Sequence, residues 1–541
     1  MLQGTPILVL KEGTERERGK SATENNIAAA RAIADAVRTT LGPRGMDKML
    51  VDSMGDITIT NDGVTILKEV DVEHPAAKML VEVAKTQDQQ CGDGTTTAVV
   101  LAGELLKRSE YLLEQNVHPT VITRGFQLAV QEAKRLLEKE IGTTVGPDDQ
   151  GILVDCARTA MGSKGVAGSR DDLAKITVEA VKKIAEVRGG KTVCDVDQIK
   201  VEKRHGGTIS DTQLIEGIIL DKERGHPRMP GEIRNAKIAL LNSALEIKKT
   251  EIESKINIKN PAQIQSFLDE EDKTFRQMVS AVKASGANVV VSQKGIDDVV
   301  LHYLAKEGIY AVKQVKESDL QKLSRATGGK IVTGIKELTS ADLGHAAKVD
   351  ERKVGDDKMT YVTGCSNPRS VSILVRGGTE HVTQEVERSL QDALKVVGSV
   401  LEDGVVCPGG GATEIDLAVK LRKWAGTVGG REQLAVEAFA QSLESIPWAL
   451  AENGGYDSIN VLIDLRSAHD GTSANRNVGI NLDDGKAADM WKLHVIEPLR
   501  VKRQALSSAA EVANMVLRID DVIASKKSSP GAGGPPGGHD H

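Results

Sequence analysis

Apolar residues recur at helical spacing through the first and last parts of the chain. A first helix should follow the capping-box pattern at residues 21–24, since apolar side chains then return every three or four positions as far as Gly42-Pro43. The same spacing dominates residues 75–140 and 406–526, whereas residues 55–67 alternate and include a turn-like Asn-Asp-Gly, which is typical of a hairpin. We therefore expect mostly helical structure at both ends of the chain.

The centre of the chain has a different pattern, with short apolar runs separated by helical stretches. This alternation is typical of an α/β domain. The runs with strand character are Lys237–Leu241, Asn288–Val291, Tyr310–Val312 and Lys330–Thr333. A charged insertion at about 245–278 interrupts them and also contains apolar residues, namely Ile256, Ile258, Ile264, Phe267, Leu268, Phe275 and Met278.

Composition narrows the class of protein. A chain of 541 residues is too long for one core and predicts roughly three or four domains. Forty per cent of the residues are hydrophobic but only 2% are aromatic, so the cores should be aliphatic. The net charge of -7, from 77 acidic and 70 basic residues, argues against a protein that binds nucleic acid.

Neither a membrane nor a secreted location is indicated. No apolar run approaches the ~18 residues that span a bilayer, and the polar N-terminus does not resemble a signal peptide. The five cysteines are scattered without a Cys-x-x-Cys pair, which argues against a zinc site or a disulfide framework. We expect a cytoplasmic protein that does not bind membranes.

The stretch Cys91-Gly-Asp-Gly-Thr-Thr-Thr97 is the strongest candidate for a functional site. Its threonines, Thr95, Thr96 and Thr97, should form the first turn of a helix, where backbone amides lack partners and the helix dipole favours an anion. Glycines let the backbone approach a phosphate, and Asp93 could hold a magnesium ion against phosphate oxygens. A Gly-Asp turn with threonine caps is the simpler alternative. The whole run favours a nucleotide phosphate site.

Further motifs extend this interpretation and are similar to those of one family. They are Leu41-Gly-Pro-Arg-Gly-Met-Asp-Lys48, Thr60-Asn-Asp-Gly-Val-Thr-Ile66, Gln87-Asp88, Val375-Arg-Gly-Gly378, Asp392-Ala-Leu394 and Val406-Cys-Pro-Gly-Gly-Gly-Ala412. Together with the Gly92–Thr97 run, they resemble the signatures of the chaperonins, the ring-shaped ATP-driven protein-folding machines. The resemblance is closest to the group II branch and covers about residues 5–526.

The resemblance implies a multidomain α and α/β fold. In it, the two ends of the chain together build one domain, two inner segments build a second, and the centre of the chain builds a third. A mostly helical equatorial domain would bind ATP, a small intermediate domain would act as a hinge, and an α/β apical domain would carry a helical protrusion. The implied division is equatorial 1–147 and 406–526, intermediate 148–218 and 373–405, apical 219–372 with its protrusion at 245–278, and a disordered Gly/Pro-rich tail at 527–541. Breaks in composition lie close to these boundaries.

The resemblance also gives roles to acidic residues that local pattern alone would not reveal. Asp62 would be a second carboxylate at the phosphates, although Asn-Asp-Gly reads equally well as a turn. Asp392 would orient the attacking water, although a mid-helix aspartate is usually a solvated polar position. Both would be catalytic, since ATP hydrolysis needs a carboxylate to orient the water. Glu497 would bind the ribose hydroxyls, and its simpler interpretation is a surface carboxylate before proline.

ATP and Mg2+ are the implied cofactors, with Asp93 as the metal ligand. Gly42 would bring the backbone to the nucleotide, although a simple helix C-cap explains Gly-Pro equally well. Lys164 would monitor the γ-phosphate, and absent side chains at Gly409, Gly410 and Gly411 would leave room for the nucleoside. The other implied nucleotide-binding residues are Leu41, Pro43 and Gly94.

The insertion at 245–278 separates the two chaperonin branches. Group I members lack it and use a separate lid protein, so this subunit should carry its own lid and need no lid co-chaperonin. The exposed apolar residues of the insertion would be lid contacts. An amphipathic helix packed on its own domain explains some of these residues but not the whole insertion. The implied partners are identical or paralogous subunits in a double ring, and unfolded client proteins.

Two other classes of function remain open. A metabolic ATP-dependent enzyme, such as a kinase, would need a small-molecule pocket beside the phosphates, and no second group of polar residues suits that purpose. A structural ring protein would bind nucleotide without hydrolysing it. The combination of Asp62, Asp93 and Asp392 argues against that second class.

Overall fold

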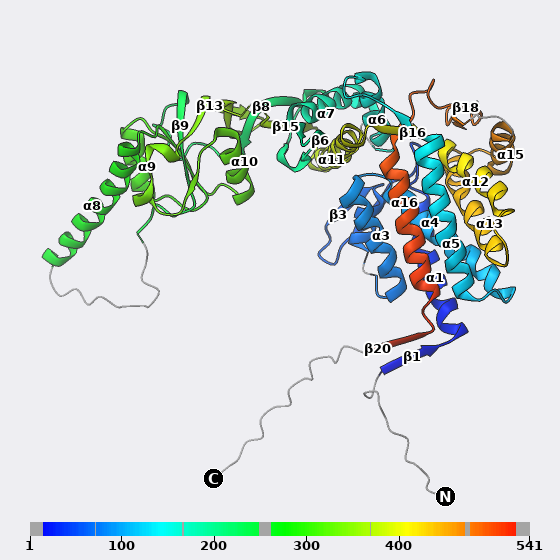
Figure 1. Cartoon of the computed structure of the whole chain (residues 1–541). Helices are drawn as coiled ribbons and strands as arrows, with labels where there is room; N and C mark the ends of the chain where they lie inside the picture. The colour runs from blue at the N-terminus through cyan, green and yellow to red at the C-terminus, as the bar shows by residue number, and fades with distance from the viewer. Residues whose placement is uncertain are drawn as a thin grey trace, which may run out of the picture.

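The computed structural model describes residues 14–70, 72–164, 167–247, 261–367, 369–470 and 476–525. They form a helical body, a small middle body and a sheet body, which follow one another in a row (Figure 1). The first and last described strands meet below the helical body, where β1 (Thr14–Arg18) pairs antiparallel with β20 (Asp521–Ser525). No helix among these residues is long and apolar enough to span a membrane.

The helical body is built around a single helix, α4 (Thr95–Glu114), which is buried along most of its length. It packs against α1, α3, α13 and α16 (Figure 1). Gly103 of α4 lies against Ala34 of α1, so small residues let these two helices approach closely. The other helices of this body are α1 (Lys20–Arg38), α2 (Gly63–Glu69), α3 (Pro75–Cys91), α5 (Pro119–Leu136), α12 (Ala412–Ala425), α13 (Glu432–Leu443), α14 (Ser445–Asn453), α15 (Ser458–His469) and α16 (Leu499–Leu517).

Short strands complete the helical body. A three-stranded sheet has the order β19-β16-β4, and two hairpins pair β2 with β3 and β17 with β18. The strands are β2 (Lys48–Val51), β3 (Ile57–Thr60), β4 (Thr143–Thr144), β16 (Val405–Pro408), β17 (Val478–Ile480), β18 (Ala487–Asp489) and β19 (Ile496–Pro498).

Two local predictions near the N-terminus were wrong in detail. The Asn-Asp-Gly sequence does not turn the hairpin but follows it, because the Asp62 carboxylate accepts a hydrogen bond from the Thr65 amide at 3.0 Å and caps α2. The capping-box pattern at residues 21–24 lies inside α1, which already begins at Lys20 after Gly19.

The middle body packs three helices together against part of the large sheet. These helices are α6 (Gln150–Ala160), α7 (Arg170–Ile184) and α11 (Glu380–Asp403), and a small hairpin of β5 (Glu186–Arg188) and β6 (Lys191–Val193) flanks them. The core contains Leu153, Val181 and Leu390, one from each helix. Thr379 caps α11, since its hydroxyl accepts a hydrogen bond from the Val382 amide at 3.3 Å.

The sheet body holds most of a nine-stranded mixed sheet with the order β11-β10-β9-β13-β14-β8-β15-β7, and β12 pairs with β9. Successive residues of β9 and β10 alternate between two cores, one under α8 and α9 and the other under α10. The strands are β7 (Lys200–His205), β8 (Gln213–Leu220), β9 (Glu232–Leu241), β10 (Val289–Ser292), β11 (Tyr310–Val312), β12 (Ile331–Val332), β13 (Gly344–Val354), β14 (Asp357–Cys365) and β15 (Val371–Gly377). The helices are α8 (Pro261–Ser285), α9 (Asp298–Lys306) and α10 (Glu317–Thr327).

The insertion at 245–278 has two parts in the structure. Phe275 packs in the core under α8 and α9, and Met278 packs against that core, so the interpretation of these two as exposed lid residues is wrong. A helix packed on its own domain explains them, because they lie on the inner face of α8. Leu268 is exposed. Residues Ile256 and Ile258, and the side chains of Ile264 and Phe267, lie outside the described part of the chain.

The predicted domain division remains a prediction. The boundary near 147 falls between β4 and α6, while those near 218, 372 and 405 fall within or at the ends of β8, β15 and β16. The strands that run from the middle body into the sheet body are therefore continuous across two of these boundaries. The tail at 527–541 lies outside the described residues.

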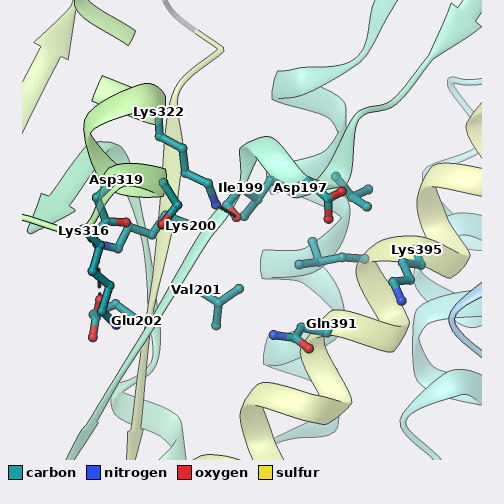
Figure 2. A pocket seen from close by; sticks show the side chains of 13 residues that line it. Asp197, Ile199, Lys200, Val201, Glu202, Lys316, Asp319, Lys322, Gln391 and Lys395 are labelled. Carbon is teal, nitrogen blue, oxygen red and sulfur yellow. Dashed lines mark hydrogen bonds and ion pairs between the residues drawn. The ribbon is translucent and has the colours of Figure 1, made fainter. Parts of the chain in front are cut away.

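A cavity of about 410 Å³ lies where the sheet body meets the middle body, between β7, α10 and α11. Figure 2 shows Asp319 and Lys322 of α10 reaching toward the start of β7. Lys200 forms an ion pair with Asp319 at 2.7 Å, and the Lys322 ammonium donates to the Ile199 carbonyl at 3.1 Å. These two polar contacts fix α10 of the sheet body against the strand that enters from the middle body.

Replacing Asp319 with alanine should loosen this contact. The Lys200 and Asp319 side chains are only 5% and 12% exposed, so loss of the carboxylate leaves a buried ammonium with Glu202 at 3.3 Å. We expect the free energy of local opening to fall by about 1–3 kcal/mol. Hydrogen exchange of the β7 and α10 amides measures this free energy of opening. A fall of about 1.4 kcal/mol raises the opening equilibrium constant, and with it the exchange rate, tenfold.

Asp298→Ala is the matched control for that experiment. Asp298 pairs with Lys313 at 3.1 Å in the same body, but its side chain is 90% exposed. An exposed pair of this kind contributes about 0–1 kcal/mol, so exchange should change little. Equal effects of the two substitutions would contradict a special role for the Lys200–Asp319 pair.

Candidate functional site

One cavity of about 390 Å³ collects residues from both ends of the chain and from the middle body. Its volume is in the range of sites that bury a small ligand. Every predicted site residue except Gly409 lines it, namely Leu41, Gly42, Pro43, Asp62, Asp93, Gly94, Thr95, Thr96, Thr97, Lys164, Asp392, Gly410, Gly411 and Glu497. The structure therefore brings together residues that are up to several hundred positions apart in the sequence.

The loop between α3 and α4 forms one wall of the cavity. Asp93 Oδ1 accepts a hydrogen bond from the Gly94 amide at 2.6 Å. Gln87 Nε2 donates both to the Asp93 carbonyl at 2.9 Å and to the Val501 carbonyl at 3.2 Å, so the loop is fixed to α16. The buried first turn of α4 directs free backbone amides toward the cavity, which suits an anion.

Asp62 serves as a helix cap and also reaches this loop. Its Oδ2 accepts hydrogen bonds from the Thr65 amide and hydroxyl, and its Oδ1 accepts one from the Thr95 hydroxyl at 3.3 Å. Asp62 can therefore be both a local helix cap and a carboxylate of the candidate site. The cap orients the carboxylate, and its place in the wall puts it beside the threonines of α4.

Lys164 and Asp392 form an ion pair that belongs to the middle body. Lys164 follows α6, and Asp392 lies in the middle of α11 but is largely buried, so its alternative interpretation as a solvated residue is wrong. Burial raises the pKa of Asp392 to about 7, since the opposing effect of Lys164 is smaller and Asp62 and Asp93 add to the rise. Asp392 can thus exchange a proton near neutral pH.

Burial also raises the pKa of Asp93 above its usual value. The ammonium of Lys164, the Gly94 amide and the ammonium of Lys502 oppose this rise, while Asp62 adds to it. The cavity therefore favours a cation near Asp93 that would stabilise the carboxylate form.

Gly42 is required by shape and not as a helix cap. The helix α1 ends at Arg38 with Thr39 as its C-cap, so the predicted end at Gly42-Pro43 is wrong. Gly42 has a φ of 83°, and a Cβ there would collide with the Leu450 side chain in the cavity wall. Asn453 Nδ2 holds this loop by donating to the Leu41 carbonyl at 2.9 Å.

A further part of the wall is apolar and suits a flat ring. It is formed by Leu450, Ile480 and Leu482 together with the backbone of Gly410 and Gly411 between β16 and α12. Glycines at this turn leave the wall free of side chains. An aromatic base could lie against such a surface without displacing any charged group.

Glu497 lies at the edge of this apolar wall, in β19. Its side chain is largely buried, so its alternative interpretation as a surface carboxylate is wrong. Gly409 lies behind it, because a Cβ at Gly409 would come within 2.6 Å of Glu497 Oε1. Gly409 therefore makes room for the carboxylate instead of lining the cavity.

Sequence reasoning missed many residues of the wall. They are Thr40, Asn61, Gly63, Thr159, Ala160, Ser163, Arg170, Ile446, Leu450, Ile480, Asn481, Leu482, Asp483, Leu493, Val495 and Lys502. Apolar residues carry no chemical signal for a ligand. Lys502 did carry one, since this lysine lies among the buried residues Leu499, Val501 and Leu506 of α16, where a charge is unusual.

A sequence model of the TCP-1/cpn60 chaperonin family matches residues 33–527. This chain belongs to the TCP-1/cpn60 chaperonin family. Thermosome subunit alpha from Thermoplasma acidophilum is 60% identical to this chaperonin over 539 residues, which are 98% of each chain. A thermosome subunit from Pyrococcus horikoshii is 57% identical over 526 residues, 97% of this chain and 95% of that one.

The comparison with solved structures agrees with the sequence comparison. An open-state monomer of a group II chaperonin from Methanococcoides burtonii has a TM-score of 0.61 and 45% identity. The match covers 79% of this chaperonin and 100% of that chain. The predicted resemblance to group II chaperonins and the predicted multidomain α and α/β fold are both confirmed.

Replacing Asp93 with alanine should remove the magnesium dependence of ATP binding. The substitution deletes a carboxylate beside the first turn of α4, where a magnesium ion would be held against phosphate oxygens. We expect magnesium-ATP affinity to fall at least about tenfold, or about 1.4 kcal/mol, with little change for ATP alone. Calorimetric titration with and without magnesium measures both values.

Asp483→Ala is the control for this substitution. Asp483 lines the same cavity but lies after β17, beside the apolar wall and not in the α3–α4 loop. Its removal should leave the ratio of the two affinities unchanged. If Asp93→Ala has the same ratio of ATP affinities with and without magnesium as the parent protein, another residue binds the metal.

Proposed function

We propose that this chaperonin is a subunit of a double ring that encloses unfolded proteins and assists their folding through ATP binding and hydrolysis. One observation carries the proposal. The phosphate loop with Asp62 and Asp93, from the helical body, and the Lys164–Asp392 pair, from the middle body, share one cavity. The first set suits binding of phosphates and the second suits hydrolysis.

The nucleotide would lie with its phosphates at the first turn of α4. Backbone amides and the hydroxyls of Thr95, Thr96 and Thr97 would donate to phosphate oxygens. Asp93 would hold Mg2+, a metal that proteins commonly bind with one or two carboxylates plus phosphate oxygens, and the ion would offset phosphate charge. The base would lie on the apolar wall, and Glu497 would accept a hydrogen bond from a ribose hydroxyl.

Asp392 would orient the attacking water and accept its proton. A base is most effective when its pKa is close to the working pH, and burial raises the pKa of Asp392 to about 7. Lys164 would contact the terminal phosphate from the same side of the cavity. Asp62 would help to place the water from the opposite body.

Hydrolysis would depend on the relative position of two bodies. Asp392 and Lys164 move with α6 and α11, whereas Asp62 and Asp93 are fixed to the helical body. The bodies are linked near the site by Lys395, whose Nζ donates to the carbonyl and carboxylate of Asp88, each at 3.0 Å. Movement of α11 would therefore remove the base from the phosphates and couple turnover to conformation.

The proposed partners follow from this function. Identical or paralogous subunits would form the rings, and unfolded proteins would be the clients. The subunit would act in the cytoplasm and carry its own lid in the 245–278 insertion, without a separate lid co-chaperonin. Relatives named as alpha and beta thermosome subunits make rings of more than one subunit type a reasonable alternative.

The rival functions are less well supported. A metabolic ATP-dependent enzyme would need a second substrate beside the phosphates, and the groups nearest to them are already assigned to phosphate, metal or water. A ring protein that only binds nucleotide would have no use for Asp392. Measured phosphate release would exclude that second rival.

Asp392→Asn should greatly slow hydrolysis while binding of nucleotide persists. The amide keeps the shape of the side chain but cannot accept the proton of the attacking water, so the loss falls on the transition state. We expect the rate of phosphate release to fall about 10²–10⁴-fold. Magnesium-ATP affinity, measured by titration, should stay within about threefold of the parent, well under the 1.4 kcal/mol of a tenfold change.

The pH dependence of hydrolysis provides a second test of Asp392. Its carboxylate must be deprotonated to act, so the parent's rate should fall as the pH drops through about 7. Lys164→Met removes the cation that opposes the rise in pKa and should move this fall to higher pH. Asp172→Asn, an exposed change in the same body, should leave the pH profile unchanged.

The substitution Asp392→Asn has one outcome that excludes the proposed role of Asp392. That outcome is a rate of phosphate release equal to that of the parent protein.

Replacing residues 248–267 with a short Gly-Ser linker should abolish enclosure of a client. The replacement keeps Phe275 and the inner face of α8, which hold the sheet body together. Rings and ATP hydrolysis should persist, because the nucleotide cavity lies in another body. A bound client should remain open to protease with ATP present, whereas the parent should protect it.

A variant of unchanged length tests whether enclosure depends on the apolar side chains of the insertion or only on the length of the insertion. Substitution of Ile256, Ile258 and Phe267 by serine keeps the insertion but removes its apolar side chains. If those side chains close the cavity, this variant should also fail to protect the client. Full protection by the shortened chain would mean that the insertion is not a lid.

A further inference from the structure

A buried lysine lies beside Glu497 in the nucleotide cavity. Lys502 of α16 is 6% exposed, and its Nζ lies 2.8 Å from Glu414 Oε1 and 2.7 Å from Glu497 Oε2. Glu414 is in the first turn of α12 and is 3% exposed. The three charged groups thus join α12, β19 and α16, and two of them, Glu497 and Lys502, line the cavity.

Two carboxylates share this single ammonium. Burial raises the pKa of Glu497, Lys502 acts to lower it, and Glu414 raises it further. Burial opposes the charge on Lys502, but the two carboxylates outweigh it and raise the pKa of the ammonium. Lys502 is therefore the group that favours the charged form of Glu497 in this buried place.

The same contacts fix the direction of the Glu497 side chain. Its Oε2 is held by Lys502, and its Oε1 lies over Gly409, where only the absence of a side chain makes room. Among the described residues, no hydrogen bond or ion pair reaches Oε1. The Gly409 amide donates to the Val495 carbonyl at 2.9 Å, so the backbone under the carboxylate is fixed too.

Glu414 completes the cluster as the anchor of Lys502. Its Oε1 binds the ammonium, whereas its Oε2 is buried without a hydrogen-bond partner. A buried carboxylate with one unsatisfied oxygen is costly, so its presence here calls for an explanation. The alternative is that the cluster only connects three elements of the fold.

We propose that Lys502 is a positioning residue for nucleoside recognition, which keeps Glu497 charged and oriented so that Oε1 accepts a hydrogen bond from a ribose hydroxyl. Glu414 holds the ammonium in place from the other side. This inference rests on the proposed function, in which Glu497 meets the ribose. It assigns Lys502 no contact with the phosphates or with the attacking water.

The test compares ribose recognition across a double-mutant cycle. Full-length parent, Lys502→Met, Glu497→Gln and the double variant are titrated with magnesium-ATP and with its 2′-deoxy and 3′-deoxy analogues. The parent should prefer ATP over at least one analogue by about tenfold, the usual size for one hydrogen bond to a charged group. Each single variant should lose most of that preference, and the double variant should lose no more.

Different results of this test contradict the role of Lys502 and the proposed function. A parental preference in Lys502→Met, or additive losses in the cycle, would overturn the positioning role and leave only a structural one. Equal affinity of the parent for ATP and both analogues would also overturn it. A parent that does not bind magnesium-ATP at all would instead contradict the proposed function.

Two further variants keep the test decisive if Lys502→Met does not fold. Lys502→Met leaves two buried carboxylates without a cation, whereas Glu414→Gln/Lys502→Met removes one charge of each sign. The double change should fold and still lose the ribose preference. Lys492→Met makes the same substitution at an exposed position of the loop before β19 and should keep the preference. Retention of the preference in the folded Glu414→Gln/Lys502→Met protein would reject the proposal.

Discussion

The burial of α4 is the constraint on which the proposed nucleotide site depends. A helix covered by neighbours along its length can expose the free amides of its first turn only at its end, and here that end opens into the cavity. The loop before it cannot move away, because Gln87 ties it to α16. A phosphate group would satisfy these amides, so the packing that stabilises the helical body also creates the site.

Sequence reasoning succeeded where structure or chemistry is concentrated in a short stretch. The helices α3, α4 and α5 and the strands β9 to β12 follow strong local patterns, and the Gly-Asp-Gly-Thr run lies within a few residues. Asp62 was harder, since a turn and a helix cap favour the same residues. The apolar wall could not be predicted, because Leu450 and Ile480 look like any core residue until distant segments come together.

The resemblance to chaperonins supplied what periodicity could not, namely which distant segments share a site. Asp392 shows this, because an amphipathic helix gives no sign that one of its acids is buried against a lysine 228 residues away. Phe275 shows the limit of the same reasoning. The resemblance predicts a lid residue at this apolar position of the insertion, but Phe275 lies on the inner face of α8 and packs in the core of the sheet body.

The contacts between bodies differ in part from those within them. Each body is held by aliphatic packing, which resists gradual deformation. Between the helical and middle bodies, apolar packing of Val406 and Ile496, from β16 and β19, on the middle core is joined by partly exposed ion pairs such as Lys395–Asp88 and Arg500–Asp403. The side chains of these two pairs are 22–32% exposed, so solvent screens each pair only in part. In the proposed mechanism, a motion that carries Asp392 toward or away from Asp93 would break these pairs and would also shift the apolar contact of β16 and β19 with the middle body.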